Sequence, residues 1–85
     1  MAGWRLVLLR PARNYLQRLP VRDRDSILDA LEALVKDPGA APVKKLKGRP
    51  EWSLRVGPWR VLLMPDPLNR VLVVTLIGPR GDVYK

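Results

Sequence analysis

The segment WSLRVGPWRVLLM, residues 52–64, decides the fold of this 85-residue chain. Residues 51–57 alternate apolar and polar, which is typical of a strand with one buried face, and residues 59–64 predict the returning strand. Gly57-Pro58 between them predicts a two-residue loop, because glycine at the first central position suits a type II′ hairpin turn. The apolar residues of both strands then share one face, which we expect to be the core: Trp52, Leu54, Val56, Trp59, Val61 and Leu63.

This register also places Arg55 directly opposite Arg60 on the other face of the hairpin. Like charges in that position destabilise a hairpin, so either water solvates both side chains or an anion is held between them. A loop one residue longer would separate the two arginines, but it would put one of them into the core. The two-residue register is therefore the better prediction.

The chain after the hairpin predicts one more strand. Residues 65–69 (PDPLN) have the composition of a turn, and residues 70–78 predict a strand that is apolar after Arg70 apart from Thr75. A strand that is apolar on both faces is expected in the interior of a sheet.

The N-terminal half predicts a strand and two helices. Residues 4–9 form the strand, and Pro11 suits the first turn of a short helix that ends at Leu19-Pro20. A second helix is predicted over residues 20–37, where apolar residues recur on one stripe before Asp-Pro-Gly ends it. Residues 39–50 are interpreted as a connection that carries several lysines.

The order strand, two helices, three strands predicts an α+β fold in one domain, residues 1–85, with the helical hairpin packed on one face of an antiparallel sheet. The chain has no cysteine, which excludes a disulfide framework and thiolate metal sites. We see no signal peptide, and the longest apolar run is far shorter than the about 20 residues of a membrane span. These features favour a cytoplasmic protein.

The net charge of +8 is unevenly distributed. Residues 21–37 contain five acids and three bases, whereas residues 44–60 contain only one acid, Glu51. A basic stretch away from an acidic helix predicts an anion-binding surface; solubility alone is the alternative, and membrane binding is less favoured. The six basic residues of the stretch are Lys44, Lys45, Lys47, Arg49, Arg55 and Arg60.

The residue types present restrict the possible chemistry. The chain has no histidine, which excludes Ser-His-Asp, Cys-His and histidine-based ribonuclease mechanisms. Asp25 and Asp29 are better interpreted as a solvated helix face than as a metal site, and no glycine-rich phosphate loop is present. Phosphate chemistry driven by cations remains: RNA supplies its own 2′-hydroxyl nucleophile, and guanidinium groups stabilise the phosphorane. Nearby positive charge also lowers the pKa of a lysine or tyrosine that must move a proton.

Three motifs in order resemble the RelE/ParE toxins. They are Leu-Lys-Gly at 46–48, LRVGPWRVL at 54–62 and the closing motif IGPRGDVY at 77–84. The helical hairpin that ends in Asp37-Pro38 also matches, so the resemblance covers nearly the whole chain. It implies a RelE-like α+β fold and a bacterial toxin neutralised by a cognate antitoxin protein.

For toxins similar to RelE, the implied activity is metal-independent cleavage of messenger RNA on the ribosome, with contacts to 16S ribosomal RNA and no cofactor. Arg60 and Arg80 match the family's phosphate-contacting arginines, and Tyr84 matches a terminal tyrosine with a proton-transfer or stacking role. The resemblance to the family's RNA-binding lysines is looser; together with the basic composition it indicates an RNA-binding set of Lys44, Lys45, Lys47, Arg49 and Arg55.

The chain departs from the family pattern in ways that leave alternatives open. Pro79 replaces the usual histidine, Ser53 stands where some active members have a strand lysine, and Pro58 occupies a usually acidic or polar turn position. The general base is therefore not identified. A ParE-like inhibitor of DNA gyrase and a degenerate member that binds only its antitoxin remain alternatives. Arg60, Arg80 and Tyr84 also have purely structural alternatives, whereas the tryptophans Trp4, Trp52 and Trp59 are predicted to be core residues.

Overall fold

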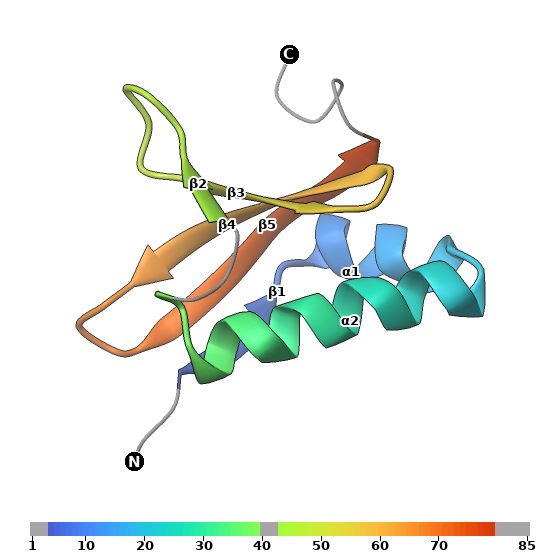
Figure 1. Cartoon of the computed structure of the whole chain (residues 1–85), viewed down its shortest axis with the longest axis horizontal. Helices are drawn as coiled ribbons and strands as arrows, with labels where there is room; N and C mark the ends of the chain where they lie inside the picture. The colour runs from blue at the N-terminus through green and yellow to red at the C-terminus, as the bar shows by residue number, and fades with distance from the viewer. Residues whose placement is uncertain (1–3, 40–42, 80–85) are drawn as a thin grey trace.

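The computed structural model describes residues 4–39 and 43–79 as two helices on one face of a five-stranded sheet (Figure 1). The strand order in the sheet is β1-β5-β4-β3-β2. Within the described residues, no helix combines the length and the apolar character needed to cross a membrane. The elements are β1 (Arg5–Leu8), α1 (Arg10–Arg18), α2 (Val21–Lys36), β2 (Val43–Lys45), β3 (Trp52–Val56), β4 (Trp59–Asp66) and β5 (Val71–Pro79).

The predicted register of the β3–β4 hairpin is confirmed. Val56 pairs with Trp59, and Arg55 pairs with Arg60. Gly57 has a φ of 57°, which a type II′ turn requires at its first central position. The alternative type I′ turn would require a positive φ at Pro58 as well, and the proline ring does not permit it.

The helical hairpin begins and ends close to the predicted positions. Pro11 lies in the first turn of α1, where its missing N–H costs no helical hydrogen bond. Leu19 has an extended backbone, with φ −77° and ψ 151°, because the following Pro20 disfavours the helical conformation. Helix α2 then runs from Val21 to Lys36.

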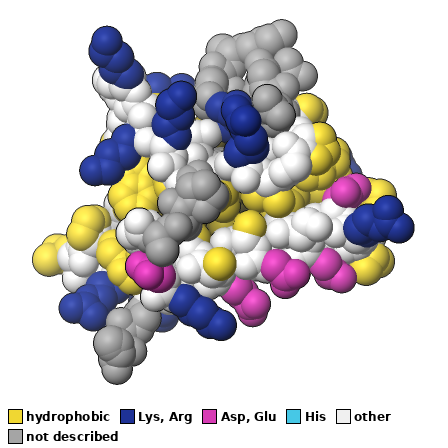
Figure 2. All heavy atoms as spheres, in the orientation of Figure 1, with side chains coloured by type: hydrophobic (Ala, Val, Ile, Leu, Met, Phe, Trp, Pro, Cys, Tyr) yellow, Lys and Arg dark blue, Asp and Glu magenta, His cyan; other side chains and the backbone are white. Residues whose placement is uncertain are grey.

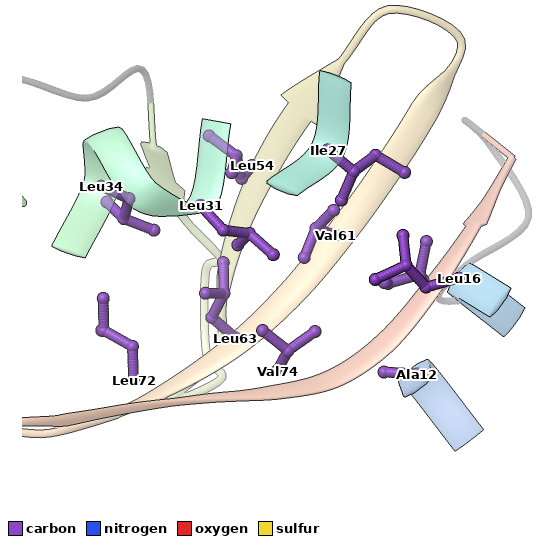
Figure 3. Packing of buried hydrophobic residues seen from close by; sticks show 11 residues of the cluster. Ala12, Leu16, Ile27, Leu31, Leu34, Leu54, Val61, Leu63, Leu72 and Val74 are labelled. Atoms are coloured by element: carbon purple, nitrogen blue, oxygen red, sulfur yellow. The ribbon is translucent and has the colours of Figure 1, made fainter. Parts of the chain in front are cut away.

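The core lies between the helices and one face of the sheet (Figure 3). Ile27, Leu31 and Leu34 of α2 point at the sheet and are fully buried. Burying one such side chain stabilises the fold by about 1.5–3 kcal/mol. All six apolar positions predicted for the hairpin belong to this core: Leu54, Val61 and Leu63 are buried, and Trp52, Val56 and Trp59 pack against them half-buried.

The prediction of an antiparallel sheet is wrong for one strand, because β1 pairs in parallel with β5. Arg5 lies beside Val71, and Leu8 lies beside Val74. Tight turns require antiparallel neighbours, but β1 leaves the sheet through two helices, so no local turn determines its direction. The sheet is therefore mixed.

Strand β2 lies within residues 39–50, for which the sequence predicts a connection. Its three residues, Val43, Lys44 and Lys45, pair antiparallel with β3 at the edge of the sheet. A strand of three residues with two lysines has too little alternation to be recognised, yet short lysine-rich strands are typical of protected sheet edges.

Strand β4 is longer than predicted and takes in the first two residues of the expected turn, Pro65 and Asp66. The turn that follows is closed by Asn69, whose side chain and backbone N–H donate to the Asp66 carboxylate at 2.9 and 3.3 Å. These hydrogen bonds lower the pKa of Asp66. Strand β5 is paired on both sides, as its apolar composition predicts.

The β4–β5 pairing contains a bulge, since Leu62 pairs with Leu76 but Leu63 pairs with Val74. Thr75 is the extra residue, and its hydroxyl donates to the carbonyl of Leu62 at 3.3 Å. The bulge explains the only polar residue of β5.

We predict that Gly57→Ala destabilises the fold by roughly 1 kcal/mol, because a left-handed backbone is unfavourable for alanine. Gly39→Ala is the matched control. Gly39 has no positive φ, and an added Cβ would lie 3.6 Å from the nearest atom, Asp37 Oδ1. There the substitution should be neutral or stabilise by about 0.5 kcal/mol through the unfolded chain. Urea unfolding measures both; equal effects at the two positions would contradict the turn assignment.

Candidate nucleic-acid interface

The face of the sheet opposite the helices contains a hollow of about 250 Å³. It lies over β2, β3 and β4, and of the described residues that line it three are cations and none is an acid. We call it the cationic hollow, defined by Lys44, Ser53, Arg55 and Arg60. The lining residues come from positions that the alternation of β2, β3 and β4 directs away from the core.

Two residue pairs of the sheet, two residues apart along β3, position these side chains on one face. Lys44 of β2 pairs with Ser53 of β3, and Arg55 of β3 pairs with Arg60 of β4. Side chains on opposite residues start about 4.5–5.5 Å apart, so the arginine pair cannot avoid mutual repulsion. The prediction that Arg55 and Arg60 share the open face is confirmed, and the shared space between them suits an anion.

The four residues differ in exposure. Lys44 and Arg55 are exposed, Arg60 is half-buried with its Nε atom buried, and Ser53 is only 5% exposed. A partly buried guanidinium is screened less by salt than an exposed one. The interactions of Arg60 are therefore screened less by salt than those of Lys44 and Arg55.

Two of the other predicted RNA-binding residues, Lys45 and Lys47, lie at different places in the structure. Lys45 points to the opposite side of β2, where it lines a second hollow of about 130 Å³ with Pro38, Gly39, Val43 and Trp52. Lys47 is exposed in the turn between β2 and β3. Neither residue contributes to the lining of the cationic hollow.

Arg49 is engaged by an acid. Its Nε and Nη2 atoms donate to the two carboxylate oxygens of Glu51 at 3.2 and 3.3 Å. These hydrogen bonds lower the pKa of Glu51, so the carboxylate stays charged and offsets the arginine. The sequence predicts Arg49 as an RNA-binding residue, and the structure pairs it with Glu51.

Arg80 and Tyr84 lie outside the described residues. The described part of β5 reaches Gly78 opposite Arg60 and Pro79 opposite Trp59. Ser53, by contrast, was noted only as a departure from a family pattern and not as a site residue. The signal that identifies it is the alternation of β3, which places Ser53 on the same face as Arg55.

The remaining predicted features lie away from the hollow. Trp4, Trp52 and Trp59 pack against the core, as expected, and the ring of Trp59 meets Tyr15 edge-on at 6.0 Å between centroids. Asp25 and Asp29 are exposed on α2, and within residues 4–39 and 43–79 no three potential metal-ligating side chains converge. Figure 2 shows acidic side chains in a row along α2 and basic side chains gathered over β2 and β3.

Solved structures of RelE-type toxins have the same fold. The chain matches the toxin–antitoxin complex RelBE2 from Mycobacterium tuberculosis with a TM-score of 0.80, 25% identity and coverage of 96% of this chain and 97% of that one. It matches the archaeal RelE–RelB complex from Pyrococcus horikoshii with a TM-score of 0.82, 23% identity and coverage of 95% and 99%.

A YoeB/ParE toxin from Agrobacterium tumefaciens also matches, with a TM-score of 0.77, 21% identity and coverage of 89% of this chain and 98% of that one. No protein-family model matches the sequence, and no curated protein matches it. The chain thus has a RelE-like α+β fold, and its structural match to RelE/ParE/YoeB toxins extends over nearly its full length.

We predict that Arg55→Thr raises the free energy of unfolding by about 0.2–1 kcal/mol at low salt, because it removes one of two opposed like charges. The gain should shrink as salt screens the repulsion. Arg5→Thr is the control, since Arg5 is an exposed strand arginine whose partner is Val71. Urea unfolding at low and high salt measures both; a loss of stability for Arg55→Thr at low salt would argue against repulsion across the hairpin.

Proposed function

We propose that this protein is the toxin of a type II toxin–antitoxin system and that it cleaves messenger RNA on the ribosome without a metal. The observation that carries the proposal is the cationic hollow, in which Lys44, Arg55 and Arg60 surround a space open to solvent. The structural match to RelE toxins supports the same conclusion. Inhibition of gyrase by protein contact would not require side chains that converge on a phosphate.

The proposed reaction uses the nucleophile of the substrate. The RNA phosphate lies in the hollow, and the neighbouring 2′-oxygen attacks phosphorus while its proton passes to a base. The bond from phosphorus to the 5′-oxygen breaks, and that oxygen receives a proton. The products are a 2′,3′-cyclic phosphate and a 5′-hydroxyl, so no water or metal is consumed.

The arginines act on the charge that develops in this step. The phosphorane carries one more negative charge than the phosphodiester, and guanidinium groups stay charged and hold phosphate oxygens in pairs. We assign this role to Arg60 and Arg80. Tyr84 is assigned a proton-transfer role, because the chain contains no histidine to perform it. Lys44, Arg55, Lys47, Lys45 and Arg49 are assigned to binding of the RNA backbone.

A toxin of this kind needs a neutralising partner. The solved relatives from Mycobacterium tuberculosis and Pyrococcus horikoshii are toxin–antitoxin complexes. An acidic segment that folds on contact would complement the basic face of this chain. We therefore propose a cognate antitoxin as its partner.

Replacing Arg60 or Arg80 by alanine should lower the rate of cleavage of ribosome-bound message roughly 100- to 1,000-fold, the usual cost of one lost charge-stabilising donor. Arg60→Lys should restore activity only in part, because it keeps the charge but loses the paired hydrogen bonds. Tyr84→Phe should slow cleavage more than it weakens RNA binding. Arg13→Ala, at an exposed position of α1, is the control and should be silent.

The assay uses programmed ribosomes and maps the 5′ ends of the cleaved message. If the wild-type protein leaves ribosome-bound message intact and blocks DNA gyrase supercoiling, the enzyme proposal is wrong. If it does neither, the protein acts only by binding its antitoxin.

We further predict that a short reading frame adjacent to the gene encodes an acidic protein that co-purifies with this chain. Binding only to the folded state should raise the melting temperature further as the antitoxin concentration increases, with a logarithmic dependence. Co-expression followed by affinity purification and thermal unfolding tests this. Failure to bind at micromolar concentration would contradict it.

A further inference from the structure

Ser53 is a buried hydroxyl-bearing residue in the lining of the cationic hollow. It is only 5% exposed, while Lys44 and Arg55 of the same lining are exposed. Among the residues that the structure describes, Ser53 is the only buried one with a polar side chain. A small side chain among long cationic ones forms the floor of the hollow.

The register of the sheet defines what surrounds this hydroxyl. Ser53 pairs with Lys44 on one side and with Leu62 on the other. Arg55 is two residues along the same face of β3, which corresponds to about 6.5 Å. Arg60 of β4, which pairs with Arg55, lies on the same face of the sheet as Ser53. An anion held by the two arginines would therefore lie within reach of the serine.

The hydroxyl of Ser53 differs from the other aliphatic hydroxyls of the chain. Ser26 donates to the carbonyl of Arg22 at 3.0 Å, and Thr75 donates to the carbonyl of Leu62. Among residues 4–39 and 43–79, no group forms a hydrogen bond with the Ser53 hydroxyl. The Ser53 oxygen is not among the buried polar atoms of the described structure that lack a partner, so it is open to the solvent of the hollow. A phosphate oxygen in the hollow can therefore take the place of water as the acceptor of this hydroxyl.

We propose that Ser53 is a phosphate-binding residue, whose hydroxyl donates a hydrogen bond to a non-bridging oxygen of the phosphate held by Arg55 and Arg60. The identification of that phosphate as part of RNA rests on the proposed function, whereas the binding of a phosphate does not. Serine suits the position because it adds a donor without a fourth positive charge. A further cation would increase the repulsion that Lys44, Arg55 and Arg60 already impose on the sheet.

The test compares Ser53→Ala with Ser26→Ala, the same substitution at the other serine of the chain. Calorimetric titration with inorganic phosphate measures affinity, and thermal unfolding in phosphate-free buffer measures stability. Ser53→Ala should weaken phosphate binding about tenfold, since it removes one hydrogen bond to a charged group. Its melting temperature without phosphate should stay the same or rise, because the lost hydroxyl has no partner in the described structure. Ser26→Ala should leave phosphate affinity unchanged.

Several outcomes would overturn the assignment of Ser53. These are wild-type affinity in Ser53→Ala, a fall in melting temperature that accompanies the loss of affinity, and no binding of phosphate by the wild-type protein up to about 10 mM. Cleavage of ribosome-bound message by the wild-type protein is measured in parallel. Serine-dependent phosphate binding without cleavage would support Ser53 and contradict the proposed function. If Ser53→Ala cleaves message and binds phosphate as well as the wild-type protein does, the result would support the proposed function and contradict the role of Ser53.

Discussion

The two-residue turn at Gly57-Pro58 is the constraint on which the rest of the structure depends. Because side chains alternate along a strand, the length of this turn decides which residues of β3 and β4 face the helices. With two residues, Leu54 and Val61 meet α2 in the core, and Arg55 and Arg60 meet on the open face. One extra residue in this turn would place a charged side chain at a core position.

The two faces of the hairpin have opposite effects on the stability of the fold. The core face contributes the burial that holds a small domain together, and small domains hide a modest share of their surface. The open face contributes repulsion among Lys44, Arg55 and Arg60. A bound phosphate reverses the sign of that contribution, because the charges that repel one another then share an anion. Stability without ligand and affinity for ligand are thus in opposition at the same residues.

Acids lie along α2, whereas bases lie on both layers of the fold, since Arg10, Arg13 and Arg18 belong to α1. Acidic side chains form a row along α2, and basic side chains gather over β2 and β3 (Figure 2). Between β2 and β3, Arg49 pairs with Glu51. Among the described residues of the cationic hollow, an extended polyanion would meet cations and no acid, and it would be attracted there.

The sequence by itself determined the elements whose signals are local: the hairpin register, the two helices with their proline boundaries, the six-residue apolar face and the pairing of Arg55 with Arg60. Alternation, helical periodicity and turn chemistry act over a few residues, so they can be recognised without the rest of the molecule. Only the tertiary structure decided the parallel direction of β1, the presence of β2 and the burial of Ser53. Each of these depends on a neighbour that is not specified by local pattern. The direction of β1 follows from how the helices return the chain to the sheet, and β2 is a strand only because β3 offers it an edge. Ser53 becomes the floor of a hollow only when longer side chains from two other strands surround it.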